Sequence, residues 1–255
     1  MMNAWRALRA GNIPAAIQIA GRSIGLEIRR NGPSARDDLR LANFLATYDV
    51  RLVLDIGANR GQFATQLLAN GYRGRIVSFE AMPHAHRELT AAAARVGERW
   101  QVAPAIALSD REGMVAFHVN DSDATSSLLA ASSKAQNTIP GIRPRAIVDV
   151  STRRLDDVFG GYSMEGQRSF LKIDVQGGEG LVLAGAQTTL DHVAGLMIEL
   201  SLSELYDRQP LAFDVLAPLL DAGFVVFDIA PAYRDSDSHK LEQIDVVLFH
   251  PDRIS

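Results

Sequence analysis

VLDIGANRG, at residues 53–61, is the stretch of this chain that decides its fold. The apolar run over 52–56 predicts a buried strand, and apolar residues that resume at helical spacing predict a helix over 60–70. Gly57 and Gly61 lie between the two elements and predict a tight turn. Strand, glycine turn and helix form a βα unit, in which a ligand can approach the backbone and the N-terminus of the helix.

A second apolar run, Ile76–Phe79, ends at Glu80. An acid at the carboxyl end of the second strand can bind the two hydroxyls of a ribose. Asp55 stands where the dinucleotide fingerprint has its first glycine, and an acid there repels a pyrophosphate. The same acid suits a cationic sulfonium ligand, so the two motifs favour S-adenosyl-L-methionine as the cofactor. The alternative is a glycine turn that only closes a βα unit.

Composition and charge restrict the class of protein. A length of 255 residues with 47% apolar content suits one α/β domain with a sizeable core. The net charge of −4 argues against nucleic acid as an obligatory substrate. The chain has no cysteine, which excludes disulfides, thiolate catalysis and cysteine-ligated zinc. No apolar run reaches the roughly eighteen residues of a membrane span, and the expected location is the cytoplasm.

The N-terminal segment is more basic than the rest of the chain. Residues 1–31 carry five arginines and one acid, Glu27. One interpretation is an amphipathic segment that rests on the inner face of an anionic membrane or on a lipid-linked substrate. The favoured alternative is a helical cap or a dimer contact, because glycine and proline residues interrupt the helical pattern. We predict a helical appendage over 1–45 and a catalytic domain over 46–255, and leave the oligomeric state open.

Strand and helix patterns alternate along the catalytic domain. This alternation predicts an α/β fold with a doubly wound, mostly parallel sheet and two terminal strands. Residues 120–145 are the one long irregular stretch, and long loops in compact domains are often lids. The expected strands are 52–56, 75–80, 100–107, 115–119 (added and antiparallel), 146–150, 169–175, 193–200, 224–229 and 244–249, and the expected helices are 39–48, 60–70, 83–96, 155–159, 178–190 and 211–222.

Polar residues at the strand ends are the candidates for chemistry, because ligands lie beyond the carboxyl ends of the strands in such sheets. We expect adenine near residues 107–109, which end in Ser109. Asp174 ends the fourth strand. It can remove the proton of an acceptor hydroxyl or orient that hydroxyl, and the alternative is that it caps the next helix. Glu179 is a weaker candidate, because an acid in a first helical turn also satisfies the helix dipole.

A metal and a histidine base are further alternatives. Asp174 and Glu199 end neighbouring strands and together can hold Mg²⁺ through oxygen ligands, but two acids do not define a site, so we predict no metal. Lys172 is expected to turn away from the core or to pair with an acid. A histidine base suits the chemistry, but no spacing selects one. The histidines nearest to the expected cleft are His84, His86 and His118.

Ordered motifs over roughly residues 50–250 resemble the FkbM family of S-adenosylmethionine-dependent methyltransferases. The motifs are LDIGANRGQF, SFEAMP, ALSDREG, Ser126-Ser127-Leu128, LDD at 155–157, LKIDVQGGEGLVLAGA and IEL. The resemblance implies a Rossmann-like class I methyltransferase with a seven-stranded sheet whose terminal strand is antiparallel. It also implies O-methylation, frequently of sugar hydroxyls in glycolipids, polysaccharides or natural products.

The site residues follow from the motifs and the resemblance together. Asp174 and Glu179 match the fourth-strand block and are the predicted catalytic residues. Ala81 replaces a common proline and Gln176 replaces a frequent glutamate, and the second change weakens a metal proposal because an amide is neutral. The predicted cofactor-binding residues are Asp55, Gly57, Ala58, Asn59, Gly61, Phe63, Glu80, Ala81, Ser109 and Asp174.

The leading hypothesis is therefore an O-methyltransferase whose partner is a hydroxylated acceptor, a glycan or glycolipid. Three alternatives stay open: a cofactor-binding module without catalysis, a methyltransferase with a non-sugar acceptor, and a nicotinamide oxidoreductase. N-methylation is disfavoured, because nitrogen acceptors commonly use a motif such as Asn-Pro-Pro-Tyr, which residues 174–177 do not resemble.

Overall fold

The computed structural model describes residues 9, 12–24 and 36–255 of the chain. The chain divides into two compact units, residues 1–43 and 44–255, and each is described by itself. Within the described part of the chain, no helix has both the length and the apolar character needed to cross a membrane.

The first unit contains helix α2 (Ile13–Ser23), and helix α3 (Asp37–Thr47) begins in it. Ile13 and Ile17 are exposed and lie four residues apart, so they share one face of α2. Most of the basic segment over residues 1–31 lies outside the described residues. Its membrane or packing role stays a prediction, as does the predicted domain boundary after residue 45.

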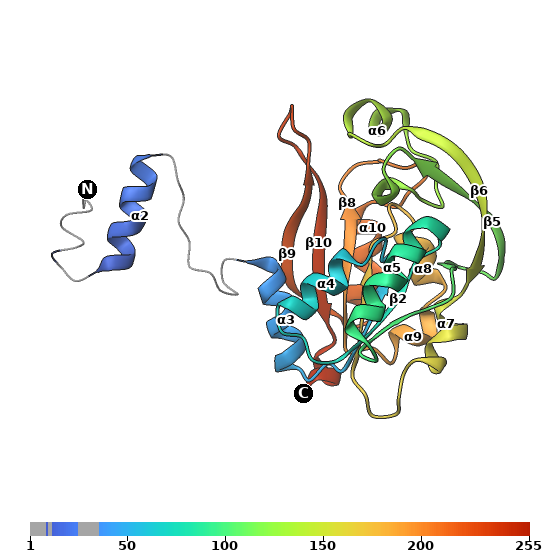
Figure 1. Ribbon diagram of the computed structural model, residues 1–255, viewed down its shortest axis with the longest axis horizontal. Helices are drawn as coiled ribbons and strands as arrows, with labels where there is room; N and C mark the ends of the chain where they lie inside the picture. The colour runs from blue at the N-terminus through green and yellow to red at the C-terminus, as the bar shows by residue number, and fades with distance from the viewer. Residues whose placement is uncertain (1–8, 10–11, 25–35) are drawn as a thin grey trace. The chain divides into compact units, whose positions relative to one another are not determined.

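Seven strands form the main sheet of the second unit. They are β1 (Leu52–Ile56), β2 (Arg75–Phe79), β3 (Trp100–Val102), β7 (Ser169–Ile173), β8 (Gly195–Ser201), β9 (Val225–Arg234) and β10 (Leu241–Phe249). Their order in the sheet is β3-β2-β1-β7-β8-β10-β9. Figure 1 shows β10 beside β9 at one edge of this sheet. The first five of these run parallel, and β10 is antiparallel to both of its neighbours. The predicted doubly wound sheet with an antiparallel terminal strand is confirmed, and its order switches between β1 and β7.

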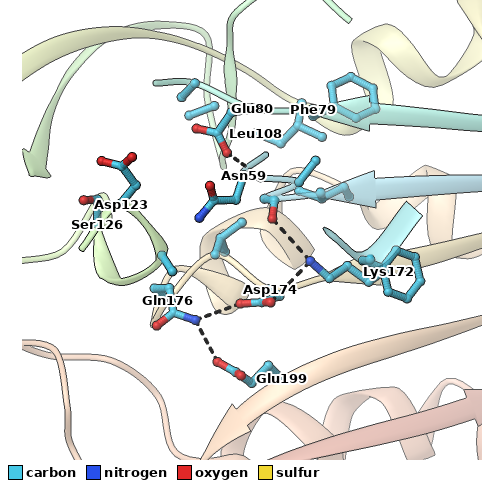
Figure 2. A pocket seen from close by; sticks show the side chains of 18 of the residues that line it. Asn59, Phe79, Glu80, Leu108, Asp123, Ser126, Lys172, Asp174, Gln176 and Glu199 are labelled. Carbon is cyan, nitrogen blue, oxygen red and sulfur yellow. Dashed lines mark hydrogen bonds and ion pairs between the residues drawn. The ribbon is translucent and has the colours of Figure 1, made fainter. Parts of the chain in front are cut away.

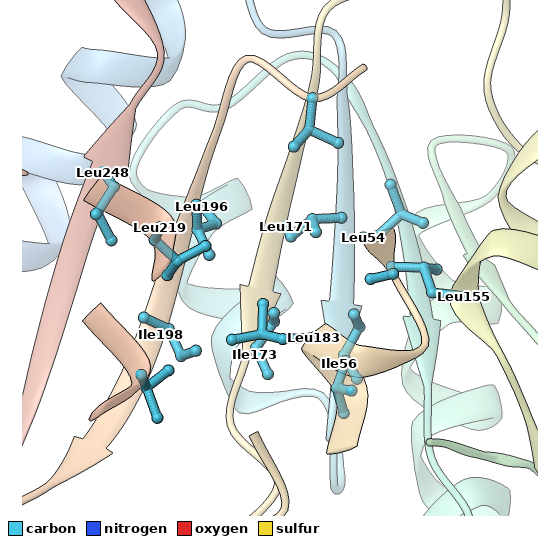
Figure 3. Close-up of a cluster of buried hydrophobic side chains, with 14 of the residues drawn as sticks. Leu54, Ile56, Leu155, Leu171, Ile173, Leu183, Leu196, Ile198, Leu219 and Leu248 are labelled. Carbon is cyan, nitrogen blue, oxygen red and sulfur yellow. The ribbon is translucent and has the colours of Figure 1, made fainter. Parts of the chain in front are cut away.

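Helices pack on this sheet and bury its central strands. Outside residues 121–143, the helices that follow α3 are α4 (Gln62–Ala69), α5 (Pro83–Val96), α7 (Leu155–Val158), η2 (Phe159–Gly161), α8 (Glu179–Ala184), α9 (Gln187–Leu190), α10 (Ala212–Asp221) and α11 (Pro251–Ile254). All five positions of β1 and of β7 are buried, as expected for parallel strands that are covered on both faces. In Figure 3, Leu183 of α8 and Leu219 of α10 lie among the apolar side chains of the sheet.

Successive residues of β1 face opposite sides of the sheet. Leu54 and Ile56 belong to the apolar cluster, together with Leu171 of β7 (Figure 3). Asp55 lies between them in the chain and therefore points to the other face. There it neighbours Lys172, its register partner on β7. One polar pair is thus placed on the two central strands of the sheet, on the face opposite the apolar cluster.

A second, three-stranded sheet differs from the prediction. Its strands, in the order β4-β6-β5, are β4 (Ala107–Leu108), β6 (Pro144–Arg153) and β5 (Gly113–Asn120). The predicted strand over 100–107 is wrong in its extent, because β3 ends at Val102 and Pro104 has no N–H to continue a ladder. The strands expected over 115–119 and 146–150 exist, but they pair with each other rather than with the main sheet.

The predicted single helix over 178–190 is also wrong, because α8 ends before Gly185 and α9 begins at Gln187. A Cβ atom at Gly185 would lie 2.0 Å from the carbonyl oxygen of Ser109. The chain therefore passes close to the turn after β4 at this point, and the helix is interrupted where only a glycine fits.

The chain between β5 and β6, residues 121–143, is called the β5–β6 segment below. It contains the short helices η1 (Asp123–Thr125) and α6 (Ser133–Thr138). The side chain of Ser132 caps α6 by accepting a hydrogen bond from the N–H of Ala135 at 3.1 Å. Ala135 is buried in a small apolar cluster with Tyr206. The stretch expected to be irregular is therefore packed against the chain that follows β8.

Candidate active site

A cavity of about 370 Å³ opens at the switch in strand order. Its walls come from the ends of β1, β2, β7 and β8 and from β4, and the β5–β6 segment contributes Asp123 and Ser126. Figure 2 shows Glu80 and Asn59 on one side of the cavity and Asp174 and Glu199 on the other. The cavity therefore lies where a doubly wound sheet binds its ligand.

The glycine turn after β1 requires its glycines. Gly57 has φ 76° and Gly61 has φ 88°, in the left-handed region that side chains disfavour. A Cβ atom at Gly57 would lie 1.9 Å from the carbonyl oxygen of Asp174. The N–H groups of Gly57 and Ala58 both donate to the carbonyl oxygen of Phe79, at 3.1 and 2.9 Å. The ends of β1, β2 and β7 are thereby held close together around the cavity.

Glu80 is oriented by the backbone around it. One carboxylate oxygen accepts the N–H of Asn59 at 2.8 Å, and the other accepts the N–H of Met82 at 2.7 Å. Burial raises the pKa of Glu80, although these two hydrogen bonds oppose the shift. Each carboxylate oxygen has a second lone pair, so Glu80 can still accept hydrogen bonds from a ligand.

Asn59 carries an unused acceptor. Its Oδ1 is buried and has no hydrogen-bond partner among the described residues. Asn59 also lines the cavity and has φ 48°, so the turn holds it in a left-handed conformation. A buried acceptor without a partner is costly, and a donor group on a bound ligand would satisfy it.

Lys172 is surrounded by acceptors. Its Nζ lies 3.4 Å from Oδ1 of Asp55 and 3.3 Å from Oδ2 of Asp174, and it donates to the carbonyl oxygen of Gly57 at 3.3 Å. Burial disfavours the charged form of Lys172, but the carboxylates of Asp174 and Asp55 outweigh burial and raise its pKa. The expectation that this lysine pairs with an acid holds, and the lysine joins the glycine turn to the end of β7.

Asp55 is placed behind the cavity wall. It is fully buried, and its Oδ2 accepts a hydrogen bond from the hydroxyl of Ser78 at 3.1 Å. Burial raises the pKa of Asp55, while the charge of Lys172 opposes that shift. The side chain therefore positions Lys172 from inside the sheet.

Gln176 connects the two acids on the other side of the cavity. Its Nε2 donates to Oδ1 of Asp174 at 2.8 Å and to Oε2 of Glu199 at 2.9 Å (Figure 2). The hydroxyl of Tyr206, which donates to the carbonyl oxygen of Thr125 at 2.9 Å, lies 3.2 Å from Oε1 of Gln176. A glutamate at position 176 would present oxygens to both carboxylates instead of donors, so the amide suits this arrangement.

Glu199 is the site residue that the sequence did not select for catalysis. Its Oε2 also accepts the amide of Gln243 at 2.6 Å. Burial and the neighbouring carboxylates of Asp174, Asp245 and Glu179 raise the pKa of Glu199 well above its ordinary value. The sequence signal for Glu199 is its place in the IEL motif at the end of a predicted strand. From the sequence, this acid was considered only as a metal ligand.

The structure brings most of the predicted residues together and separates a few from the cavity. Glu179 is buried, and its Oε1 accepts the N–H groups of Val175 and Gly177 at 3.0 and 3.2 Å, which stabilises the turn after β7. None of the three candidate histidines lines the cavity. The predicted residues that line it are Gly57, Ala58, Asn59, Phe63, Glu80, Ala81 and Asp174, whereas Asp55, Gly61, Ser109 and Glu179 do not.

No three His, Asp or Glu side chains in the described part of the chain form a group able to hold a metal ion. Asp174 and Glu199 share the amide of Gln176 between them, and Asp174 contacts Lys172. The absence of a metal from the reaction stays a prediction.

The strand order, the glycine turn and the acid at the end of β2 define a Rossmann-like methyltransferase. The sequence profile described as Methyltransferase FkbM domain matches residues 55–226, and the chain belongs to this family. The resemblance found in the motifs is confirmed, and the protein is an S-adenosylmethionine-dependent methyltransferase.

Similar proteins include 2-O-methyltransferase NoeI of Sinorhizobium fredii (strain NBRC 101917 / NGR234). It is 28% identical over 219 residues, which cover 82% of this chain and 86% of NoeI. Among solved structures, Sp1610 of Streptococcus pneumoniae in complex with S-adenosyl-L-methionine is 13% identical with a TM-score of 0.47, over 84% of this chain and 72% of that one. M. capricolum TrmK with S-adenosyl-homocysteine is 6% identical with a TM-score of 0.46, over 82% and 67%.

Proposed function

We propose that this methyltransferase transfers a methyl group to a hydroxyl of a neutral sugar. The observation that carries the proposal is the acceptor side of the cavity, which is lined by Asp174, Glu199 and Asp245 and by the amide of Gln176. Carboxylates and amides exchange hydrogen bonds with hydroxyl groups. The nearby cation, Lys172, is already paired with two carboxylates, so this wall repels a phosphate rather than binding it.

The name of the relative NoeI agrees with the oxygen acceptor, since it is called a 2-O-methyltransferase. The proposed acceptor is a glycolipid, a polysaccharide or a glycosylated natural product. The acids in the cavity and the net charge of −4 disfavour nucleic acid as a partner. The proposed location is the cytoplasm.

The site fits S-adenosyl-L-methionine on two grounds. Oδ1 of Asn59 is a buried acceptor without a hydrogen-bond partner among the described residues, and Gly57 exposes backbone to the cavity with no side chain. Glu80 would accept hydrogen bonds from the ribose hydroxyls, and the apolar wall at Phe79 and Leu108 would contact the adenine. The bound cofactor supplies a methyl group on a sulfonium centre, which is open to attack by a nucleophile.

The residues of the chain then have three tasks. Asp174 and Gln176 orient the acceptor hydroxyl, since both line the cavity and are fixed by hydrogen bonds. The β5–β6 segment limits the access of water, because Asp123 and Ser126 form part of the wall. A carboxylate removes the hydroxyl proton.

The test is transfer of labelled methyl groups from S-adenosyl-L-methionine by the full chain. The acceptor panel contains neutral oligosaccharides, glycolipids, phosphorylated sugars, a non-sugar alcohol and RNA. We expect label in a base-stable ether on a neutral sugar. Label only on RNA, on a phosphorylated sugar or on the non-sugar alcohol would contradict the proposal. Tight cofactor binding without turnover on any acceptor would favour the non-catalytic module.

A further inference from the structure

Glu199 has one fixed and one free carboxylate oxygen. Its Oε2 accepts the amides of Gln176 and Gln243, at 2.9 and 2.6 Å. Within the described part of the chain, Oε1 accepts no hydrogen bond, and Glu199 lines the cavity. Two donors, one from the turn after β7 and one from β10, therefore aim the side chain and leave one oxygen for an acceptor hydroxyl.

Asp174, the other carboxylate candidate, is more fully engaged. Its Oδ1 accepts the amide of Gln176 at 2.8 Å, and its Oδ2 lies 3.3 Å from the ammonium of Lys172. A proton arriving on Asp174 would have to compete with the lysine for the same oxygen. Asp174 is therefore better suited to orienting a hydroxyl than to removing its proton.

The surroundings of Glu199 also suit proton transfer. The charged or titratable groups that face it are Lys172 of β7, Asp174 directly after β7, Glu179 of α8, Asp245 of β10 and Tyr206. Asp245 is its direct register partner on the antiparallel strand. Burial and the acids among these groups raise the pKa of Glu199, and a base with a raised pKa holds a transferred proton more readily.

We propose that Glu199 is the general base of the reaction and that Gln176 and Gln243 are its positioning residues. This inference rests on the proposed function. The oxygen of the acceptor hydroxyl attacks the methyl carbon, the new O–CH₃ bond forms and the S–CH₃ bond breaks. The electron pair of the broken bond goes to sulfur, which becomes a neutral thioether. The hydroxyl proton goes to Oε1 of Glu199, whose carboxylate becomes a carboxylic acid.

The first experiment compares Glu199→Gln with the matched control Glu98→Gln, an exposed acid outside the cavity. Single-turnover rates are measured with the hydroxyl acceptor that the wild type methylates fastest. Glu199→Gln should lower the rate by about 10²- to 10⁴-fold. The Kd for S-adenosyl-L-methionine should stay within about twofold in both variants, and Glu98→Gln should keep the wild-type rate. Normal cofactor binding also shows that the variant has folded.

The pH profile separates a base from a merely structural residue. The wild-type rate should rise with pH as Glu199 loses its proton, and this rise should vanish in Glu199→Gln but persist in Asp174→Asn. Gln243→Met removes a donor to the ionised carboxylate, so the same rise should move to higher pH with its plateau retained. Glu199→Asp should retain part of the activity and keep the rise with pH.

Two outcomes overturn the proposal. If Glu199→Gln keeps both the wild-type rate and the wild-type pH profile while Asp174→Asn loses them, the base is Asp174 and only this inference fails. If the wild type methylates no hydroxyl acceptor at all, the proposed function fails, and the role of Glu199 fails with it. The first outcome requires an active wild type and the second an inactive one, so the two are distinguishable.

Discussion

Asp55 and Lys172 form a buried ion pair across the two central strands of the sheet. The residues are register partners on β1 and β7, and Nζ of Lys172 lies 3.4 Å from Oδ1 of Asp55. The ammonium also contacts Asp174 at 3.3 Å. The acid of the glycine motif is therefore connected, through one lysine, to Asp174, the residue proposed to orient the acceptor hydroxyl.

Replacing Lys172 should destabilise the fold. Lys172→Met leaves the charge of Asp55 buried without an opposite charge, since among the described residues only the hydroxyl of Ser78 then donates to it, and breaking a buried pair in this way costs about 3–5 kcal/mol. The free energy of unfolding, measured by urea denaturation, should fall by that amount. Lys240→Met is the control, because its pair with Glu242 leaves the lysine half exposed and should change stability by less than about 1 kcal/mol.

The double variant Asp55→Asn with Lys172→Met tests the pairing itself. Removing both charges should cost less than the two single changes added together, because neither charge is then left alone. Equal stability of Lys172→Met and the wild type would contradict a buried pair of this kind.

Glu80→Ala should weaken cofactor binding. The change removes the acceptor proposed for the ribose hydroxyls and releases the N–H groups of Asn59 and Met82. Hydrogen bonds to a charged group contribute about 1.5–3 kcal/mol, so the Kd should rise about 10- to 150-fold. Isothermal titration calorimetry with S-adenosyl-L-methionine measures the effect, with Glu98→Ala as the control. A Kd equal to that of the wild type would remove Glu80 from the predicted cofactor site.

The stability of the protein should depend on the ionisation of Glu179. Burial raises the pKa of Glu179 from 4.5 to about 7, although its backbone hydrogen bonds oppose the shift. Because the folded pKa is the higher one, the stability that this group contributes is complete below the unfolded pKa and is lost as pH rises through about 7.

Glu179→Gln removes this titration and can keep the two N–H groups bonded to its amide oxygen. Relative to this variant, the wild type should lose on the order of 3 kcal/mol of unfolding free energy between about pH 4.5 and about pH 8. Urea denaturation at both pH values measures the difference. A constant difference between the two proteins would show that Glu179 does not titrate in this range.

The central strands and the glycine turn could be predicted from the sequence, because the patterns that indicate them are local. The apolar runs of β1 and β7 and the glycine turn depend on residues close together in the chain, and the cavity lies where they predict it. The position of Asp55 is different. Alternation places Asp55 opposite Leu54 but cannot show that Lys172, more than a hundred residues later, occupies the same face. The structure shows that Asp55 is buried, and a direct contact between Asp55 and the cofactor stays a prediction.

The rest of the site could not be predicted from the sequence, because it depends on pairing between strands that are distant in the chain. Gln243 reaches Glu199 only because β10 pairs with β8, so the residues next to either one in the sequence do not indicate the contact. The sequence predicted strands over 115–119 and 146–150 correctly, but the partner of a strand is set by tertiary packing. In the same way, Pro104 ends the ladder of β3 and redirects the chain into the second sheet.

The β5–β6 segment is joined to the glycine turn by Arg60, and this contact should hold the segment over the cavity. Nη2 of Arg60 lies 2.8 Å from Oδ2 of Asp123, and Asp123 forms part of the cavity wall. Both side chains are partly exposed, so Arg60→Gln should lower the free energy of unfolding by less than about 1 kcal/mol. Its effect should be local instead. Amide hydrogen exchange over residues 121–127 should become faster, and bound S-adenosyl-L-methionine should dissociate a few times faster.

Arg145→Gln is the matched control for Arg60→Gln, because Arg145 pairs with Asp121 in the same segment but not with the glycine turn. It should leave the dissociation rate of the cofactor unchanged. High salt screens exposed ion pairs, so the wild type in about 1 M salt should approach the dissociation rate of Arg60→Gln. Equal exchange over residues 121–127 in Arg60→Gln and the wild type would mean that packing against Tyr206, whose hydroxyl donates to the carbonyl oxygen of Thr125 at 2.9 Å, holds the segment without the arginine.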